Sequence, residues 1–172
     1  KGCPGVVTIV GEPGIGKTYL AEHYFCRLNR CNYIYSKSNQ FKSADSIAIS
    51  KVIEQLTSYT LTLSKQNLKK IQIAIEKAIG SDLSLLYKIN PSIIQITSQP
   101  VQTAINDLIK TKYRVKNAVL KYISIIAEYC FPLVIFFDDL QWIDALTNEI
   151  VRTLIKKIDQ SNVMLVLSYR SN

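Results

Sequence analysis

The sequence contains little histidine, and its cysteines follow no recognisable pattern. Its 172 residues include one histidine and four cysteines. No two cysteines form a C-x-x-C pair and their spacing fits no disulfide framework, so we expect free thiols in a reducing compartment. His23 stands near Cys26 and Cys31, but only Cys26 lies within a helical turn of it, and the chain offers no second ligand pair. A zinc site is therefore the weaker interpretation of these residues.

Long apolar runs and targeting signals are also absent. No stretch approaches the roughly 18 to 20 consecutive apolar residues needed to cross a bilayer, and the N-terminus lacks the order of residue types found in a secretion signal. Neither internal repeats nor low-complexity linkers are visible. We therefore expect a soluble, cytoplasmic protein with no membrane partner. About half of the residues are apolar (48%), which suffices for the core of a single domain or of a fragment of a larger protein.

Acidic residues are fewer than basic ones. The formal net charge is +8 and the pI is near 9.3, which raises the question of nucleic-acid binding. The lysines are spread along the chain, however, with only short pairs at Lys69-Lys70 and Lys156-Lys157. This distribution favours a solvated basic surface over a nucleic-acid interface, which we keep as the alternative.

One segment carries a complete phosphate-binding motif. The motif G-x-x-x-x-G-K-[ST] occupies residues 11–18, and it directly follows the apolar run Val6–Val10, which has the character of a buried strand. A glycine-rich turn that binds nothing is the alternative, and the flanking strand and amphipathic helix disfavour it. The predicted nucleotide-binding residues are Gly11, Glu12, Pro13, Gly14, Ile15, Gly16, Lys17, Thr18 and Tyr19.

The chemistry of phosphate binding explains these residue types. Glycines at positions 11, 14 and 16 allow backbone angles that turn successive N–H groups toward an anion. Lys17 supplies a positive charge for the β- and γ-phosphates, and the Thr18 hydroxyl is placed to be a ligand of Mg²⁺. The helix expected from Lys17 onward adds the positive end of its dipole. We therefore predict that this loop binds ATP together with Mg²⁺.

A second motif ends in two carboxylates. The apolar run Leu133–Phe137 is rich in β-branched and aromatic residues and is followed directly by Asp138 and Asp139, an arrangement known as Walker B. Ligands of parallel α/β sheets bind beyond the carboxyl ends of the strands, so Asp138 should lie on the same edge as the phosphate loop. We assign Asp138 to Mg²⁺ and Asp139 to the attacking water. A turn and helix cap is the alternative.

Strands and helices alternate except in the middle of the chain. Together the patterns predict an α/β fold, a P-loop NTPase three-layer sandwich with a parallel sheet. Residues from about 37 to 111 carry helices with no strand between them. This helical insertion, between the second strand and the Walker B strand, should lie beside the sheet, where it completes the core or receives a partner. Strands are expected at 6–10, 33–36, 133–137 and 163–169, and helices at 17–28, 44–60, 64–80, 81–87, 145–158 and, as one or two helices, from Pro100 to before Pro132.

Three segments together resemble a known family. The string IFFDDLQWID at residues 135–144, the phosphate loop, and LVLSYR at 165–170 resemble the AAA-like ATPase domain of the STAND signalling class. More narrowly, they resemble the predicted ATPase module of large bacterial signalling proteins. The resemblance covers nearly the whole chain, so residues 1–172 should form a single P-loop NTPase core. This core should be a fragment of a larger protein, and the fragment should lack the lid domain. Its partners should be ATP or ADP and appended kinase or sensor domains.

The resemblance implies further site features. The strand ending near Arg170 should lie between the phosphate-loop strand and the Walker B strand, so that Arg170 stabilises charge at the γ-phosphate beside the catalytic Lys17 and Asp139. An exposed Arg170 after an edge strand is the alternative. The family usually has Asp where Asn39 stands, and Trp142 should pack under the phosphate loop.

The function that these features imply is a slow, Mg²⁺-dependent ATPase that acts as a nucleotide switch in signal transduction. Many AAA-type hydrolases carry Glu at the position of Asp139, and the shorter side chain suggests slow turnover. Two alternatives stay open. One is a nucleic-acid-associated AAA-type ATPase of the origin-recognition or loader kind, and the other is a nucleotide-binding switch without turnover.

Overall fold

A single parallel sheet organises the chain. The computed structural model describes residues 4–27, 31–38, 47–97 and 108–171, and the segments predicted at 44–46 and 100–107, together with Asn39, lie outside them. The sheet order is β1-β4-β3-β2, with all three pairings parallel. The strand nearest the C-terminus therefore lies between the phosphate-loop strand and the Walker B strand, as the resemblance implied. The strands are β1 (Gly5–Gly11), β2 (Asn32–Lys37), β3 (Leu133–Asp138) and β4 (Val163–Arg170).

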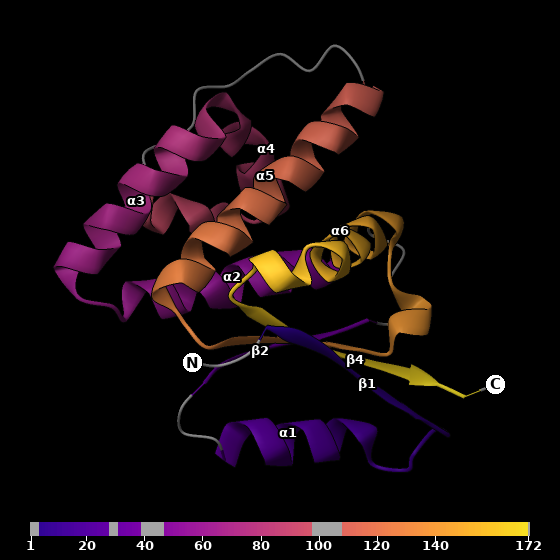
Figure 1. The fold of residues 1–172 in the computed structure, drawn as a ribbon. Helices are drawn as coiled ribbons and strands as arrows, with labels where there is room; N and C mark the ends of the chain where they lie inside the picture. Colours follow the sequence, from indigo (N-terminus) through magenta and orange to yellow (C-terminus); the bar gives the residue numbers. More distant parts are fainter. Residues whose placement is uncertain (1–3, 28–30, 39–46, 98–107, 172) are drawn as a thin grey trace.

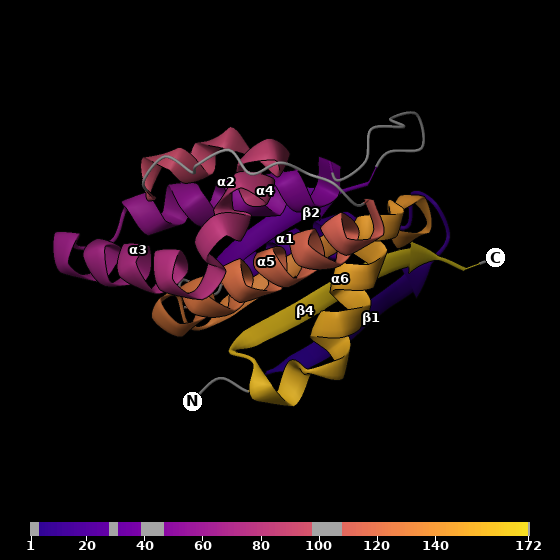
Figure 2. The same cartoon turned by 90° about the horizontal axis from the view of Figure 1, so that it is seen from above.

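Helices lie on both faces of the sheet, but β1, the end strand among those described, stays largely exposed, with Val7 37% and Val10 48% exposed. The expectation of a buried strand at Val6–Val10 was therefore wrong. In Figure 1, α1 (Lys17–Arg27) lies alone on one face, and the other helices gather on the opposite face, with α2, α5 and α6 nearest the sheet. Seen from above, α6 crosses over β4 and β1 (Figure 2). This confirms the predicted α/β sandwich. The remaining helices are α2 (Ile47–Leu61), α3 (Lys65–Ile79), α4 (Leu83–Ile89), α5 (Leu108–Tyr129) and α6 (Ala145–Lys156), with 3₁₀ turns at Gly80–Asp82, Pro91–Gln95, Leu140–Trp142 (η3) and Ile158–Gln160.

The apolar run of β3 is continuous because both of its faces are buried. All six residues of the strand are buried. Successive side chains point to opposite faces, so Ile135 and Phe137 join the large core under the helices, whereas Val134 and Phe136 pack with Phe25 of α1. The same strand thus separates two hydrophobic clusters, and its end brings Asp138 to the edge of the sheet.

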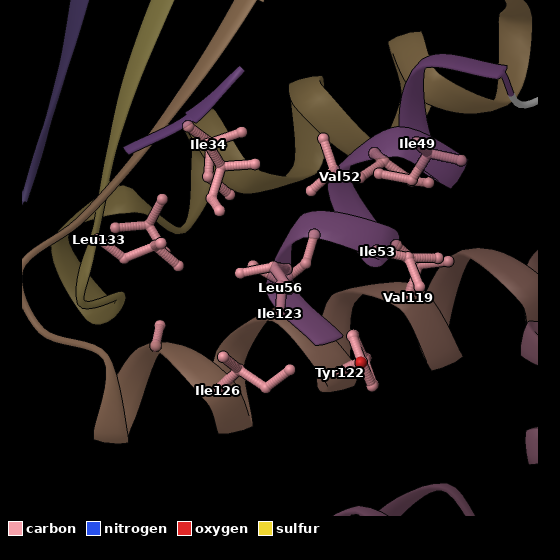
Figure 3. Packing of buried hydrophobic residues seen from close by; sticks show 14 of the residues in the cluster. Ile34, Ile49, Val52, Ile53, Leu56, Val119, Tyr122, Ile123, Ile126 and Leu133 are labelled. Carbon is pink, nitrogen blue, oxygen red and sulfur yellow. The ribbon is translucent and has the colours of Figure 1, made fainter. Parts of the chain in front are cut away.

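The helical insertion completes the large core. Ile53 and Leu56 of α2 and Tyr122 and Ile123 of α5 are fully buried in one cluster with Leu133 of the sheet. Figure 3 shows the α2 and α5 side chains meeting beside the strands. Between the two roles that the sequence allowed, the described part of the insertion therefore fills the core, and α2 also lies directly against β2.

The predicted helix boundaries have visible causes. The Ser64 Oγ accepts a hydrogen bond from the Asn67 N–H at 3.3 Å and so caps α3, which ends at Gly80 with a φ of 56°. At the next break, the Asn90 side chain accepts from the Ser92 N–H at 2.9 Å and starts the turn at Pro91. These residues were the boundaries expected from the sequence.

An edge strand of the sheet is closed by a side chain of the insertion. Among the strands of the described residues, β2 pairs with β3 alone, so alternate backbone groups of β2 point away from the sheet. The Tyr35 N–H donates to the Gln55 Oε1 at 3.1 Å, and the Gln55 Nε2 donates to the Tyr35 carbonyl at 2.6 Å. Gln55 of α2 thus takes the place of a neighbouring strand at this point.

Replacing this glutamine should loosen the edge. We expect Gln55→Ala to lower the free energy of unfolding by about 1–2 kcal/mol, because two backbone hydrogen bonds lose their partner at a partly accessible site. Urea unfolding followed by circular dichroism measures the change. Lys51→Ala, one turn earlier on α2 and exposed, is the matched control and should cost less than about 0.5 kcal/mol. Equal losses in the two variants would contradict the assignment.

Candidate functional site

The carboxyl ends of the four strands meet at a polar cleft. Because all pairings are parallel, the residues that end each strand share one edge of the sheet. A cleft of about 360 Å³ lies at this edge. Its lining residues are Pro13, Gly14, Gly16, Lys17, Thr18, Tyr19, Lys37, Asp138, Asp139 and Arg170.

The phosphate loop has the backbone that its motif requires at two of three glycines. Gly14 and Gly16 have φ angles of 81° and 96°, in the left-handed region that side chains rarely adopt. The expectation for Gly11 was wrong, because it ends β1 without a positive φ. A side chain at position 11 would instead be crowded, since a Cβ there would lie 3.1 Å from the Ile15 Cγ2. The loop's conformation is consistent with a nest for an anion at the start of α1.

Lys17 is held against its own loop. Its Nζ donates to the carbonyl oxygens of Gly11 and Glu12, each at 2.9 Å. The ammonium group therefore lies at the rim of the cleft that the loop encloses. A positive charge in this position suits a polyphosphate, which needs a mobile cation beside the backbone amides.

Asp138 is a buried carboxylate with both oxygens occupied. The residue is 1% exposed. Its Oδ2 accepts from the Thr18 hydroxyl at 2.7 Å and from the Tyr35 hydroxyl at 3.1 Å. Its Oδ1 accepts from the Ser168 hydroxyl and from the Asp139 N–H at 3.1 Å. These bonds offset the cost of burying the carboxylate and fix its orientation.

Asp139 adopts a backbone conformation unusual for a side-chain-bearing residue. Its φ is 57°, the one positive φ outside glycine in the described ranges. Aspartate tolerates this region better than most residues. Backbone conformations of this kind are strained, and they are often found at functional sites. The Asp139 carboxylate accepts from the Gln141 Nε2 at 3.0 Å and forms ion pairs with Lys37 at 3.6 Å and Arg170 at 3.8 Å. Arg170 thus lies beside Asp139 at the cleft.

The two sequence motifs meet as expected, but three of the neighbours were missed. Tyr35, Lys37 and Ser168 contact the two aspartates, although neither motif contains them. Since the strand-edge rule applies to every strand, it could have drawn attention to the ends of β2 and β4. Trp142, expected to be packed under the phosphate loop, is 36% exposed in η3.

The donor set suits magnesium and a polyphosphate. A threonine hydroxyl and an aspartate carboxylate oxygen lie 2.7 Å apart, and Mg²⁺ prefers such hard oxygen ligands, with waters and phosphate oxygens completing its shell. Lys17, Lys37 and Arg170 line the same cleft and balance negative charge. The residues present therefore fit the pair of ligands that the sequence predicts.

The histidine and cysteines show other surroundings. The His23 ring stacks on Tyr19, with ring centroids 5.5 Å apart. Burial raises the pKa of the Cys130 thiol to about 12, so it stays a neutral packing group. Among the described residues, no three His, Cys, Asp or Glu side chains gather into a metal cluster, and the Cys26 side chain lies outside those residues.

The comparisons with known proteins agree with this geometry. A family model described as the AAA ATPase domain matches residues 1–166, and the chain therefore belongs to this family. The chain is also 25% identical over 157 residues to the hybrid signal transduction histidine kinase G of Dictyostelium discoideum. That match covers 91% of this chain and 5% of the relative's length. The family supports a nucleotide-binding ATPase module.

No helix in the described part of the chain combines the length and the apolar character that crossing a lipid bilayer requires.

Proposed function

We propose that this chain binds ATP with Mg²⁺ in the cleft, hydrolyses it slowly and acts as a nucleotide switch in signal transduction. The observation that carries the proposal is the 2.7 Å hydrogen bond between the Thr18 hydroxyl and Asp138, which joins the phosphate loop to the Walker B aspartate across 120 residues. This contact places the two proposed magnesium ligands side by side.

The phosphate loop and Lys17 hold the phosphates, and Thr18 and Asp138 hold the metal. Bound Mg²⁺ neutralises charge on the phosphate oxygens. Asp139 orients the attacking water and accepts its proton, and Arg170 stabilises negative charge at the γ-phosphate. The geometry supports these roles because Asp139 and Arg170 lie 3.8 Å apart at one end of the cleft.

Slow turnover is proposed because Asp139 has a shorter reach than the Glu that many AAA-type hydrolases carry at this position. Its carboxylate is in addition already engaged by Lys37, Gln141 and Arg170. The switching role is supported by the relative, which is named as a signal transduction histidine kinase and of which this chain matches only 5%. Appended kinase or sensor domains are therefore the proposed recipients of the nucleotide state.

Two measurements on the wild-type chain test the function. Isothermal titration with ATP and ADP, with Mg²⁺ or with EDTA, should show binding that Mg²⁺ strengthens. A coupled phosphate assay should then show slow release of phosphate from ATP. Retention of ATP without any release would favour the binding-only switch, and absence of binding under all conditions would overturn the proposal.

A nucleic-acid-associated ATPase is the second candidate, favoured by the net charge of +8. Arg114, Lys121 and Lys157 line a groove of about 510 Å³ between α5 and α6. Two of these cations have partners within the fold, since Arg114 pairs with Asp82 and Lys121 donates to the Ala78 carbonyl. We therefore prefer the signalling switch. A gel-shift series with duplex and single-stranded DNA at low salt would show steeply salt-dependent binding if the second candidate holds.

The sensing role of Arg170 gives a selective prediction. We expect Arg170→Ala to lower the affinity for ATP about tenfold more than the affinity for ADP, because a charge-assisted contact to the γ-phosphate is lost at a partly exposed site. Titration calorimetry with both nucleotides measures the difference. Arg152→Ala, which removes an exposed arginine on α6, is the control and should change neither affinity. Equal losses for ATP and ADP in Arg170→Ala would exclude γ-phosphate sensing.

A further inference from the structure

Tyr35 contributes a hydrogen bond to the metal-binding aspartate from a strand that neither motif includes. Its hydroxyl donates to the Asp138 Oδ2 at 3.1 Å, the same oxygen that accepts from Thr18 at 2.7 Å. Tyr35 pairs in register with Phe136, two residues before Asp138, so its side chain reaches forward along the sheet to the carboxylate. β2 therefore contributes directly to the hydrogen bonding of the proposed metal ligand.

The distribution of donors gives this hydroxyl a specific task. The Oδ1 of Asp138 is held by Ser168 and by the Asp139 N–H. The Oδ2 is held by Thr18 and Tyr35, and Thr18 is the other proposed magnesium ligand. Of the two hydroxyls that donate to Oδ2, the Tyr35 hydroxyl is thus the one that is not expected to bind the metal itself. An aspartate carboxylate rotates over a broad range about its last bond unless both oxygens are held.

The Tyr35 side chain is fixed in place by its surroundings. The ring packs on Phe136 with centroids 5.4 Å apart. The backbone on both sides of the residue is held by Gln55, as described for the edge of the sheet. Little freedom is left for the hydroxyl to move.

We propose that Tyr35 is a positioning residue for magnesium, whose hydroxyl holds the Asp138 Oδ2 in the orientation that binds the ion. The inference rests on the proposed function, since it needs Mg²⁺ at Thr18 and Asp138. It adds a residue to that site and a reason why β2 is part of it. Hydrogen-bond partners of metal ligands typically change metal affinity by about 10- to 100-fold when they are removed.

Tyr35→Phe isolates the hydroxyl, because the ring and its contact with Phe136 are retained. Tyr33→Phe is the matched control, since Tyr33 lies on the same face of β2 and its ring also packs near Phe136, with centroids 6.4 Å apart. The measurement is ADP binding by titration calorimetry at graded Mg²⁺ concentrations, and again in EDTA. For Tyr35→Phe we expect the Mg²⁺ concentration at half-maximal effect to rise roughly tenfold or more, with the affinity in EDTA unchanged.

The outcomes distinguish a failure of the Tyr35 role from a failure of the proposed nucleotide binding. If the wild type binds nucleotide with Mg²⁺ dependence and both tyrosine variants share that dependence, the role of Tyr35 is wrong and the proposed function stands. If affinity falls equally with Mg²⁺ and in EDTA, Tyr35 acts on the fold and the positioning role is likewise wrong. If the wild type binds no nucleotide, the proposed function fails and this inference fails with it.

A second measurement avoids substitution of the hydroxyl. 3-Fluorotyrosine is incorporated at position 35 or at position 33, and the fluorine NMR shift is followed while Mg²⁺ is added to the ADP-loaded chain. The signal at position 35 should move with the same Mg²⁺ dependence as nucleotide binding, and the signal at position 33 should stay within its line width. A constant signal at position 35 would overturn the inference even if Tyr35→Phe proved unstable.

Discussion

Asp139→Asn should lower the rate of phosphate release by roughly 10²- to 10⁴-fold and leave ATP affinity unchanged. The amide cannot accept the proton of the attacking water, whereas the carboxylate can. Asparagine is the informative replacement because, like aspartate, it tolerates the φ of 57° found at this position. Alanine would add backbone strain and mix a folding effect with a chemical one. Single-turnover phosphate release with saturating ATP and Mg²⁺ measures the rate.

The nearby Asp144→Asn is the matched control. Asp144 caps α6 by accepting from the Thr147 N–H at 2.9 Å, and asparagine caps helices about as well as aspartate. The same change of carboxylate to amide, five positions along the chain, should therefore leave phosphate release unaltered. A wild-type rate in Asp139→Asn would assign the proton transfer to another group, and an equal fall in both variants would indicate a general loss of structure.

Much of the fold and of the site could be predicted from the sequence. The boundaries at Ser64, Gly80 and Pro91 were predictable because capping and turn chemistry act over a few residues. The four strands and the meeting of Thr18 with Asp138 were predictable because the strands of a parallel sheet end on one edge. The position of β4 between β1 and β3 came from the family resemblance, since strand periodicity does not determine sheet order.

The features that were missed depend on contacts between distant segments. Tyr35 belongs to a strand that was predicted, but an aromatic residue in a strand reads equally well as core. Gln55 reads as an ordinary surface residue of a helix until β2 is known to be an edge strand. Gly11 does not have a positive φ, and a side chain is disfavoured there because the Ile15 side chain lies close by. In each case the physical reason exists only after the chain has folded.

Lys17→Ala should weaken ATP and ADP binding by about 100-fold or more. Each charge-assisted hydrogen bond to a phosphate is worth roughly 1.5–3 kcal/mol, and the ammonium is placed to serve two phosphates. The substitution should cost little stability, because the carbonyls of Gly11 and Glu12 that accept from Lys17 lie at the rim of the loop, where water can replace it. Thermal unfolding of the free variant checks this point separately from affinity.

Lys69→Ala removes the same unit of charge from an exposed position on α3 and serves as the matched control. Its nucleotide affinity should equal that of the wild type, because long-range attraction between exposed charges is largely screened at physiological salt. Titration calorimetry on both variants at constant ionic strength therefore separates local phosphate binding from the general effect of a basic chain. Unchanged affinity in Lys17→Ala would show that the loop at residues 11–18 does not hold the nucleotide. Equal losses in the two variants would instead assign nucleotide binding to net charge.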